Sequence, residues 1–169
     1  MRPPETVMIA ITLADDTLAV MSVVTIEYAD DGTVRWTRPA TKDVVDAEVA
    51  RTPIDADKLP IKGWRPIDPR DVPTDRTYRN ALRDTGSALA HDMDHVRRLA
   101  LDDLRVERAP ALAELDAKWN RATGQGDAKQ AAVVEAERQR LRDLPATLAA
   151  ALAGAVTVED AKRLRETVK

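Results

Sequence analysis

Two histidines at helical spacing are the residues of this sequence best suited to hold a metal ion. His91 and His95 are the only histidines in the chain, and Asp94 lies between them. On a helix, side chains four residues apart share a face, so both imidazoles can chelate one divalent ion, with Asp94 as a possible third ligand. A catalytic zinc site typically uses three protein ligands, and no ligand from elsewhere stands out. A metal-dependent hydrolase is therefore an alternative function, while a polar first helical turn explains the same residues.

Arginines at helical spacing form a second candidate site, for phosphate. Arg76, Arg79 and Arg83 recur at intervals of three and four residues. A ridge of this kind can contact the phosphates of a nucleic acid. Aspartates are interleaved with the arginines, however, and the whole chain carries a net charge of −3. Intrahelical ion pairs explain the pattern better, so a nucleic-acid-binding accessory protein is the weakest alternative and no nucleic-acid partner is expected.

The sequence lacks other common catalytic signatures. It contains no cysteine, so a thiol nucleophile and a disulfide framework are both excluded. Ser22 and Ser87 are the only serines, and neither lies in the context of a nucleophile elbow. The Gly-Gln-Gly run at residues 124–126 lacks the third glycine of a phosphate-binding loop. We therefore expect no enzymatic activity and no cofactor.

The composition favours helices that pack through alanine and leucine. Aromatic residues make up 3% of the 169 positions, and phenylalanine is absent. A large sheet sandwich normally uses more aromatic residues, because each ring buries a large apolar area. No apolar run approaches the roughly 20 residues of a membrane-spanning helix, and the first residues lack a signal-peptide pattern. We therefore expect no membrane partner and a protein that is made in a cytoplasm.

Residues 1–73 are predicted to form a β-rich segment that ends in a proline-rich linker. Residues 6–13 and 18–28 are rich in β-branched and apolar residues, which is typical of strands. An Asp-Asp-Gly turn at residues 30–32 predicts a hairpin, with residues 33–37 as the returning strand. Residues 44–51 are ambiguous and can form a short helix.

The linker contains a tryptophan that is a candidate for contact with a partner. Five prolines between Pro53 and Pro73 exclude a continuous helix and disfavour central strands. Trp64 lies among them, preceded by Gly63 and followed by an Arg-Pro pair. Because tryptophan is enriched among the residues that dominate protein interfaces, Trp64 is a candidate interaction residue.

Residues 74–169 are predicted to form a helical hairpin domain. A short helix is expected over residues 76–84, a long helix from about residue 90 to 122, and a second long helix from residue 127 to about 144. A final helix is expected over residues 158–168. Two helices joined by a short loop form an antiparallel αα-hairpin. The predicted fold class is therefore α+β, with a small N-terminal β segment, a proline-rich linker, a long antiparallel hairpin and a C-terminal helix.

Prolines and an apolar stripe set further expectations for the hairpin. Pro110 is expected to kink or break the first helix near Glu107, and Pro145 to end the second, because proline removes a backbone donor. Apolar residues of the first helix recur at spacings of three and four, namely Leu101, Leu104, Ala111, Leu112, Leu115 and Trp119. This stripe predicts a surface for a partner or for oligomerisation.

Four stretches of the chain resemble a group of small tailed-bacteriophage tail proteins. They are DRTYRNALR at residues 75–83, HDM at residues 91–93, RVERAPALAELD at residues 105–116 and LRDLP at residues 141–145. In that group, an Arg-aromatic-Arg-Asn-Ala element precedes a helical hairpin that ends in a Leu-Arg-Asp element. The last stretch also resembles the end of phage tail assembly chaperones and tail-fibre-associated proteins. The resemblance covers about residues 64–168.

The resemblance implies a non-enzymatic virion or tail protein, structural or an assembly factor, that acts at the tail, tail fibre or neck. Its partners would be phage tail or tail-fibre proteins, or further copies of the chain. Its location would be the virion or, during assembly, the host cytoplasm. No catalytic residue carries over. We expect the contacts to come from aromatic, arginine and stripe side chains, namely Trp64, Tyr78, Arg79, Leu112, Leu115 and Trp119.

Overall fold

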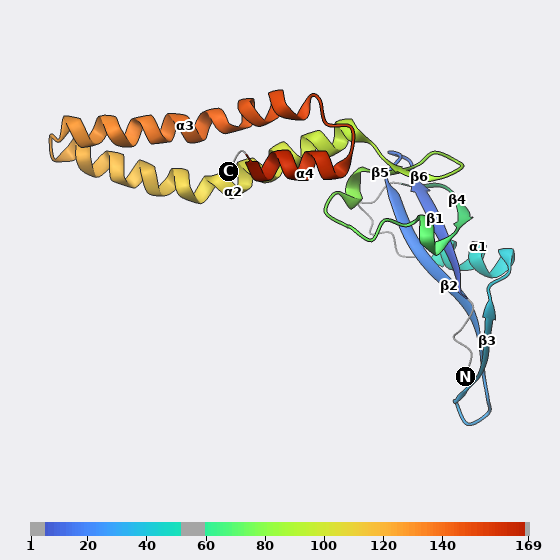
Figure 1. The fold of residues 1–169 in the computed structure, drawn as a ribbon. Coiled ribbons are helices and arrows are strands. Elements are labelled where there is room, and N and C mark those ends of the chain that lie inside the picture. The colour runs from blue at the N-terminus through green and yellow to red at the C-terminus, as the bar shows by residue number, and fades with distance from the viewer. Residues whose placement is uncertain (1–5, 52–59, 168–169) are drawn as a thin grey trace. The chain divides into compact units, whose positions relative to one another are not determined.

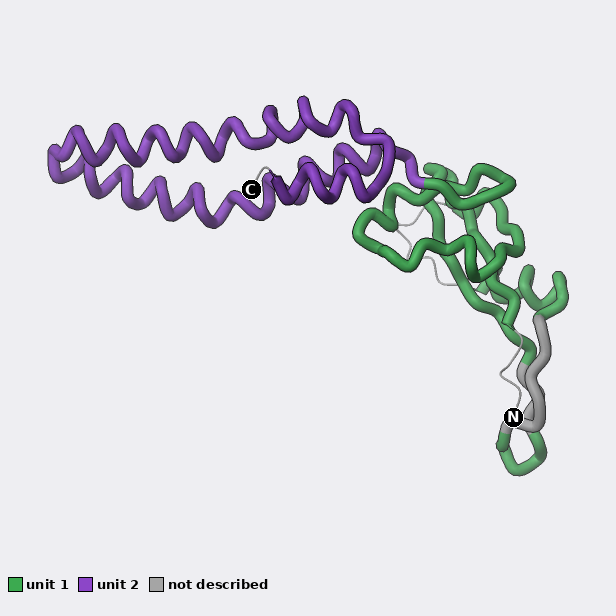
Figure 2. The backbone as a smooth tube through the Cα atoms, in the orientation of Figure 1, with its two compact units in different colours: residues 1–90 green, residues 91–169 purple. Residues whose placement is uncertain are grey.

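The computed structural model describes residues 6–51 and 60–167, and for residues 26–28 and 34–39 it describes the backbone alone. The chain is α+β, as predicted, with antiparallel strands followed by long helices (Figure 1). It divides into two compact units, unit 1 at residues 1–90 and unit 2 at residues 91–169 (Figure 2). The division falls after Ala90 rather than after residue 73, so residues 74–90 belong with the strands.

Unit 1 is built on a four-stranded antiparallel sheet with the strand order β3-β2-β1-β4. The strands are β1 (Val7–Leu13), β2 (Leu18–Tyr28), β3 (Val34–Pro39) and β4 (Ile61–Ile67). The three strands expected before residue 40 and the hairpin between the second and third are confirmed. Gly32 closes that hairpin with a φ of +79°, a conformation that glycine adopts without strain.

Strand β4 lies inside the segment predicted as a linker, so that prediction is wrong for residues 61–67. β4 pairs antiparallel with β1, with Ile11 opposite Trp64 and Ile9 opposite Pro66. It is an edge strand of the described sheet, where a proline without an N–H group is tolerated. A one-turn 3-10 helix, η1 (Pro69–Asp71), follows it.

A short helix covers one face of the sheet. Helix α1 (Lys42–Arg51) confirms the helical interpretation of residues 44–51. Its Val45 and Val49 form a buried cluster with Ile9 and Ile11 of β1 and with Val23 of β2. This cluster is the apolar core between the sheet and α1.

Residues 76–91 form turns and a short two-stranded sheet, and the helix predicted over residues 76–84 is wrong. The 3-10 turn η2 (Arg79–Ala81) leads into β5 (Leu82–Asp84), which pairs with β6 (Leu89–His91). The Asp75 carboxylate accepts a hydrogen bond from the backbone N–H of Thr77 at 2.9 Å, a local bond that competes with helix formation. β5 also contacts β1 and β2 and so joins the core of unit 1.

Unit 2 is an antiparallel helical hairpin with a third helix beside it. Its helices are α2 (Met93–Gly124), α3 (Ala128–Leu152) and α4 (Val158–Thr167), which confirms the hairpin and the C-terminal helix. Asp92 caps α2 by accepting hydrogen bonds from two backbone N–H groups of its first turn, and Asp127 accepts one at the start of α3. None of the described helices is both long and apolar enough to cross a membrane.

Both hairpin helices continue past their prolines. α2 extends beyond Pro110, and α3 extends beyond Pro145 to Leu152, so the predicted end of the second helix at Pro145 is wrong. Pro145 cannot donate to the carbonyl of Leu141, but Arg108 of α2 donates to that oxygen from Nη1 at 2.7 Å. A side chain from the neighbouring helix therefore replaces the missing donor, and this tertiary contact cannot be read from the proline alone.

Candidate functional site

The two long helices of unit 2 meet along a line of side chains that we call the distal seam. Its residues follow alternating steps of three and four, the spacing of a coiled coil, and each is buried or half-buried. The residues between them are mostly exposed. The distal seam consists of Arg108, Leu112, Leu115, Trp119 and Ala122 of α2 and Ala131, Val134, Arg138 and Leu141 of α3.

The hairpin base, in contrast, has a third helix against it. Its most buried apolar residues are between 0% and 2% exposed, and they are Val96, Ala100 and Leu104 of α2 and Leu148 and Leu152 of α3. From α4, Arg165 pairs with Asp103 at 3.0 Å and also with Glu107. Figure 1 shows α4 beside the half of the hairpin that lies away from the α2–α3 turn.

Ala122, Val134 and Leu141 of the distal seam are buried, but its other apolar residues keep part of their surface exposed. Leu112, Leu115 and Trp119 were predicted as interaction residues, and all three are half-buried on the distal seam. Two helices alone bury only the inner side of such residues, whereas a third helix would cover more of them. The structure brings these three residues together on one line of the hairpin.

A charged residue interrupts the apolar seam and links the two helices. Arg138 lies over the ring of Trp119, 5.2 Å from the ring centroid, and pairs with Asp116 of α2 at 2.7 Å. It also pairs with Glu135, and its side chain is only 15% exposed. Arg108 is the other charged residue of the seam, and a polar residue at a seam position fixes the register of a coiled coil at some cost in stability. The sequence signal for this role is the arginine that interrupts the apolar repeat of α3.

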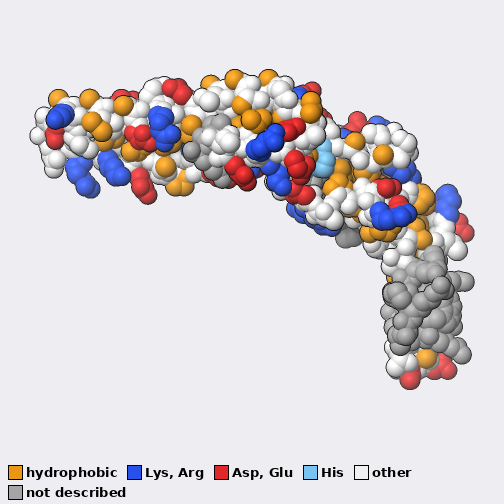
Figure 3. All heavy atoms as spheres, in the orientation of Figure 1, with side chains coloured by type: hydrophobic (Ala, Val, Ile, Leu, Met, Phe, Trp, Pro, Cys, Tyr) orange, Lys and Arg blue, Asp and Glu red, His pale blue; other side chains and the backbone are white. Residues whose placement is uncertain are grey.

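Several arginines of unit 2 serve internal contacts. Arg97 donates from Nε to the carbonyl of Leu152 at 3.0 Å and from Nη2 to that of Ala155 at 2.7 Å, which satisfies carbonyl groups at the end of α3. Arg105 pairs with Asp102 of its own helix at 2.6 Å. Figure 3 shows basic and acidic side chains interspersed along the helices on the face in view. The Arg105–Asp102 pair matches the expectation of ion pairing within helices, whereas the two Arg97 bonds join α2 to the end of α3.

The arginine ridge predicted for residues 76–83 does not form. Arg76 lies in a turn, Arg79 in η2 and Arg83 in β5, so the three arginines share no helical face. Arg83 donates to the carbonyl of Asn80 at 2.8 Å. Arg79 is exposed and stays a candidate contact, whereas Tyr78 is 1% exposed and belongs to the core of unit 1.

The predicted helical pair of histidines is also wrong. His91 ends strand β6, whereas His95 lies in the first turn of α2, after the capping residue Asp92. The helical spacing that would place both imidazoles on one face therefore does not apply. Among residues 6–51 and 60–167, no group of three or more His, Cys, Asp or Glu side chains is arranged to hold a metal ion.

Trp64 borders a hollow on one face of the unit 1 sheet. Helix α1 covers part of the same face. The hollow has a volume of about 650 Å³ and is lined by Val7, Ala40, Lys42, Val45, Gly63, Trp64, Arg65 and Pro66. The indole N–H of Trp64 donates to the Asp46 carboxylate at 2.8 Å, which fixes the ring. Lys42 lies 5.8 Å from the ring centroid and pairs with Asp46 at 2.6 Å. The hydrogen bonds that Asp46 accepts lower its pKa, with the bond from Lys42 having the larger effect and the bond from Trp64 the smaller one.

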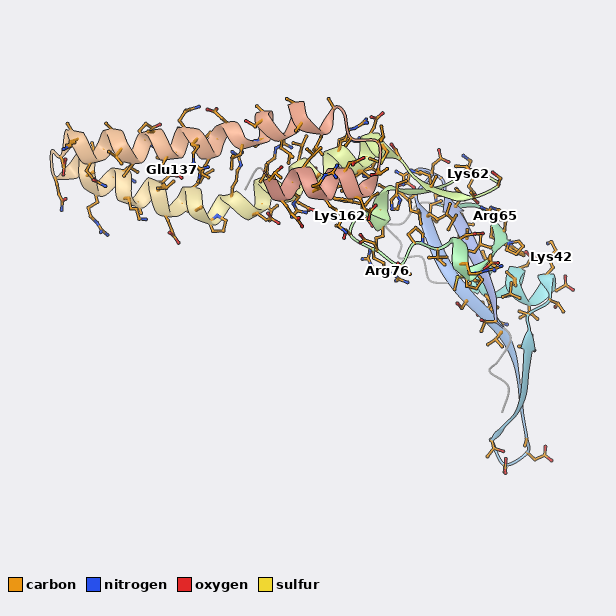
Figure 4. All side chains as sticks on the ribbon, viewed as in Figure 1. Lys42, Lys62, Arg65, Arg76, Glu137 and Lys162 are labelled. Carbon is orange, nitrogen blue, oxygen red and sulfur yellow. The ribbon has the colours of Figure 1, made fainter. Side chains whose placement is uncertain are left out.

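An ion pair connects β4 to β5 on the side of β4 that is opposite to Trp64. Arg65 alternates with Trp64 along β4, and its guanidinium holds the Asp84 carboxylate with an Nη2–Oδ1 distance of 2.7 Å (Figure 4). The Asp84 side chain is 11% exposed, and a second hydrogen bond runs from Nε at 2.9 Å. These bonds lower the pKa of Asp84 and raise that of Arg65. The sequence did not indicate this pair, because its partners lie 19 residues apart in segments predicted as linker and helix.

Comparisons of this chain with protein-family models, with curated proteins and with solved structures gave no match.

Proposed function

We propose that this chain is a non-enzymatic bacteriophage virion or tail protein that works through protein–protein contacts of its helical hairpin. It acts as a structural component or as an assembly factor at the tail, tail fibre or neck. The family proposal rests on the resemblance carried by residues 75–83, 91–93, 105–116 and 141–145. The interaction proposal rests on the hairpin itself.

The distal seam is the observation that supports a role in protein contact. Leu112, Leu115 and Trp119 are half-buried there, whereas the most buried apolar residues of the base are at most 2% exposed. From Arg108 to Ala122 the seam is about 20 Å long at ~1.5 Å rise per residue, which is four turns of helix. An amphipathic helix of a partner, or of a further copy, can cover such a line with apolar residues at heptad spacing.

The charged side chains around the seam would orient a bound partner rather than attract it by net charge. Acidic and basic side chains alternate on these helices, as in the pairs Arg140–Glu137 at 2.8 Å and Arg142–Glu135 at 2.9 Å. A mixed surface of this kind favours one register and one partner over others, because like charges repel in the wrong arrangement. Figure 4 labels Glu137 on the hairpin, away from α4.

Quantitative mass spectrometry of purified particles, and of assembly intermediates from the same infected cells, tests the family proposal. We expect the chain in a fixed ratio to tail proteins in one of these fractions. A tagged chain should also retain a tail or tail-fibre protein in pulldowns from those cells. A chain that is absent from both fractions, stays a stable monomer and retains no virion component would contradict the proposal.

A further inference from the structure

We propose that the edge of β4 that faces away from β1, with the hollow at Trp64, binds an extended segment of a partner protein that carries an apolar side chain between acidic ones. This site belongs to unit 1 and does not depend on the function proposed for the hairpin. The segment would add to the sheet as a further strand and place its apolar side chain in the hollow.

The edge of β4 supplies the main-chain part of such a site. β1 is the strand partner of β4 within the described sheet, so the backbone groups of alternate β4 residues point away from β1. An added strand takes its affinity from hydrogen bonds to such groups and its specificity from pockets that accept alternate side chains. Gly63 leaves space at this strand, since a Cβ atom there would meet no heavy atom within 4 Å.

The hollow supplies the side-chain pocket. Trp64 and Pro66 contribute to it from the edge strand, Val7 from β1 and Val45 from α1, so its lining is largely apolar. The polar edge of the Trp64 ring is already bonded to Asp46, which leaves the carbon face of the ring to contact a ligand. A volume of about 650 Å³ is ample for one apolar side chain together with part of its backbone.

The charges at the edge favour an acidic strand and disfavour a second copy of β4. β4 carries the exposed Lys62 and no acidic residue, its Arg65 being held by Asp84, and Lys42 lies at the hollow. Figure 4 labels the three basic residues. Lys62 pairs with Asp16 and Lys42 with Asp46, but both lysine side chains are more than half exposed. Such exposed pairs contribute little to stability and exchange readily for another carboxylate. Two antiparallel β4 edges would oppose basic residues of both copies, which is unfavourable.

A displayed library of random nonapeptides, selected on the immobilised full chain, tests this site. We expect enriched peptides with an apolar residue flanked by acidic residues at alternate positions. A synthetic peptide from this set should shift the indole N–H signal of Trp64 in NMR spectra and leave that of Trp119 in place. Ala40→Met fills the hollow and should weaken binding at least tenfold, by roughly the loss of one buried apolar side chain.

Lys62→Glu is the second variant, because the side chain of Lys62 is exposed and can be changed without affecting the core. It should weaken the acidic peptide about threefold and strengthen a lysine-substituted version of it, as expected for a cross-strand charge pair. No enrichment, enrichment of basic peptides, or equal binding by both variants and the wild type would overturn the proposal. Sedimentation completes the test: a wild-type dimer that Ala40→Met converts to a monomer would assign the edge to a second copy instead.

Discussion

The base and the distal half of the hairpin use the same two helices in different ways. At the base, α4 completes a three-helix core whose most buried apolar residues are between 0% and 2% exposed. Along the distal seam, Leu112, Leu115 and Trp119 are half-buried between two helices. The difference shows that the most deeply buried apolar residues lie at the base, while the distal half retains partly exposed apolar side chains.

Arginines connect the helices in both halves. At the base, Arg97 and Arg165 bind carbonyl and carboxylate oxygens and hold the ends of the helices together. In the distal half, Arg138 lies within the seam itself and covers the ring of Trp119. Arg108 of the distal seam donates to the Leu141 carbonyl much as Arg97 donates to carbonyls at the base, so the contact with an aromatic ring is what distinguishes Arg138.

The largest expected effect comes from a truncation in the base. Leu148→Ala removes a fully buried side chain and should lower the free energy of unfolding by about 3 kcal/mol, within the usual range for such a cavity. Leu115→Ala, the matched distal change, should cost about 1 kcal/mol because that side chain is half exposed already. Urea unfolding followed by circular dichroism at 222 nm measures both. Equal losses of unfolding free energy in the two variants would contradict the distinction between the base and the distal half.

The next effect concerns Arg108, where the two halves meet. Arg108→Met removes the donor to the Leu141 carbonyl and should destabilise unit 2 by about 2 kcal/mol, since a buried acceptor loses its partner. Pro145→Ala restores an N–H group to that carbonyl, so Arg108→Met should cost much less in the Pro145→Ala background. A double-mutant cycle in urea measures this difference, and strict additivity would show that Arg108 does not replace the missing donor.

In unit 1, the ion pair between Arg65 and Asp84 should lose its stabilising effect in acid, which gives a comparison for the contacts of unit 2. Asp84→Asn should destabilise unit 1 by about 2 kcal/mol at pH 7, because it breaks a partly buried charge pair. The Asp84 pKa in the folded chain lies below its unfolded value of about 3.9, so the stabilisation is complete above that pH and is lost as the pH falls through the folded pKa. The difference between wild type and variant should therefore shrink below about pH 4. Urea unfolding followed at the Trp64 indole N–H signal measures it, and a difference that does not depend on pH would contradict the assignment.

The smallest effect is expected at Arg138. Arg138→Gln removes the cation from the ring of Trp119 and should cost about 1 kcal/mol, with a change in Trp119 fluorescence. Arg140→Gln is the matched control on the same helix, because its pair with Glu137 is exposed and its loss should be close to neutral. Similar losses for both variants would show that the seam position of Arg138 has no special role.

Long periodic segments were predictable from the sequence, and contacts between segments were not. The strands before residue 40, the two hairpin helices and the final helix follow from local patterns of apolar residues and turns. β4 was missed because five prolines favoured a linker, although an edge strand accepts Pro66. The end of α3 was predicted too early, at Pro145. The hydrogen bond that replaces the missing donor there comes from Arg108, which is 33 residues from its acceptor Leu141 in the sequence.

The candidate interaction residues show the same limit. The stripe through Leu112, Leu115 and Trp119 was visible as spacing, and the structure places it on the distal seam. Spacing could not show that α4 covers only the base, because that depends on how the chain folds back after α3. Nor could it show that Tyr78 is buried, since a tyrosine beside exposed arginines reads as surface.

Incorporation of a distal-seam variant into particles tests the central claim most directly. The double variant Leu112→Gln with Leu115→Gln should keep the helical content of the wild type but fall at least tenfold in particles or assembly intermediates, because two apolar contacts are lost. Val106→Gln is the control, since its side chain is 73% exposed and lies outside the seam. The account predicts normal incorporation of Val106→Gln alone. Equal incorporation of the double variant, the control and the wild type would contradict it.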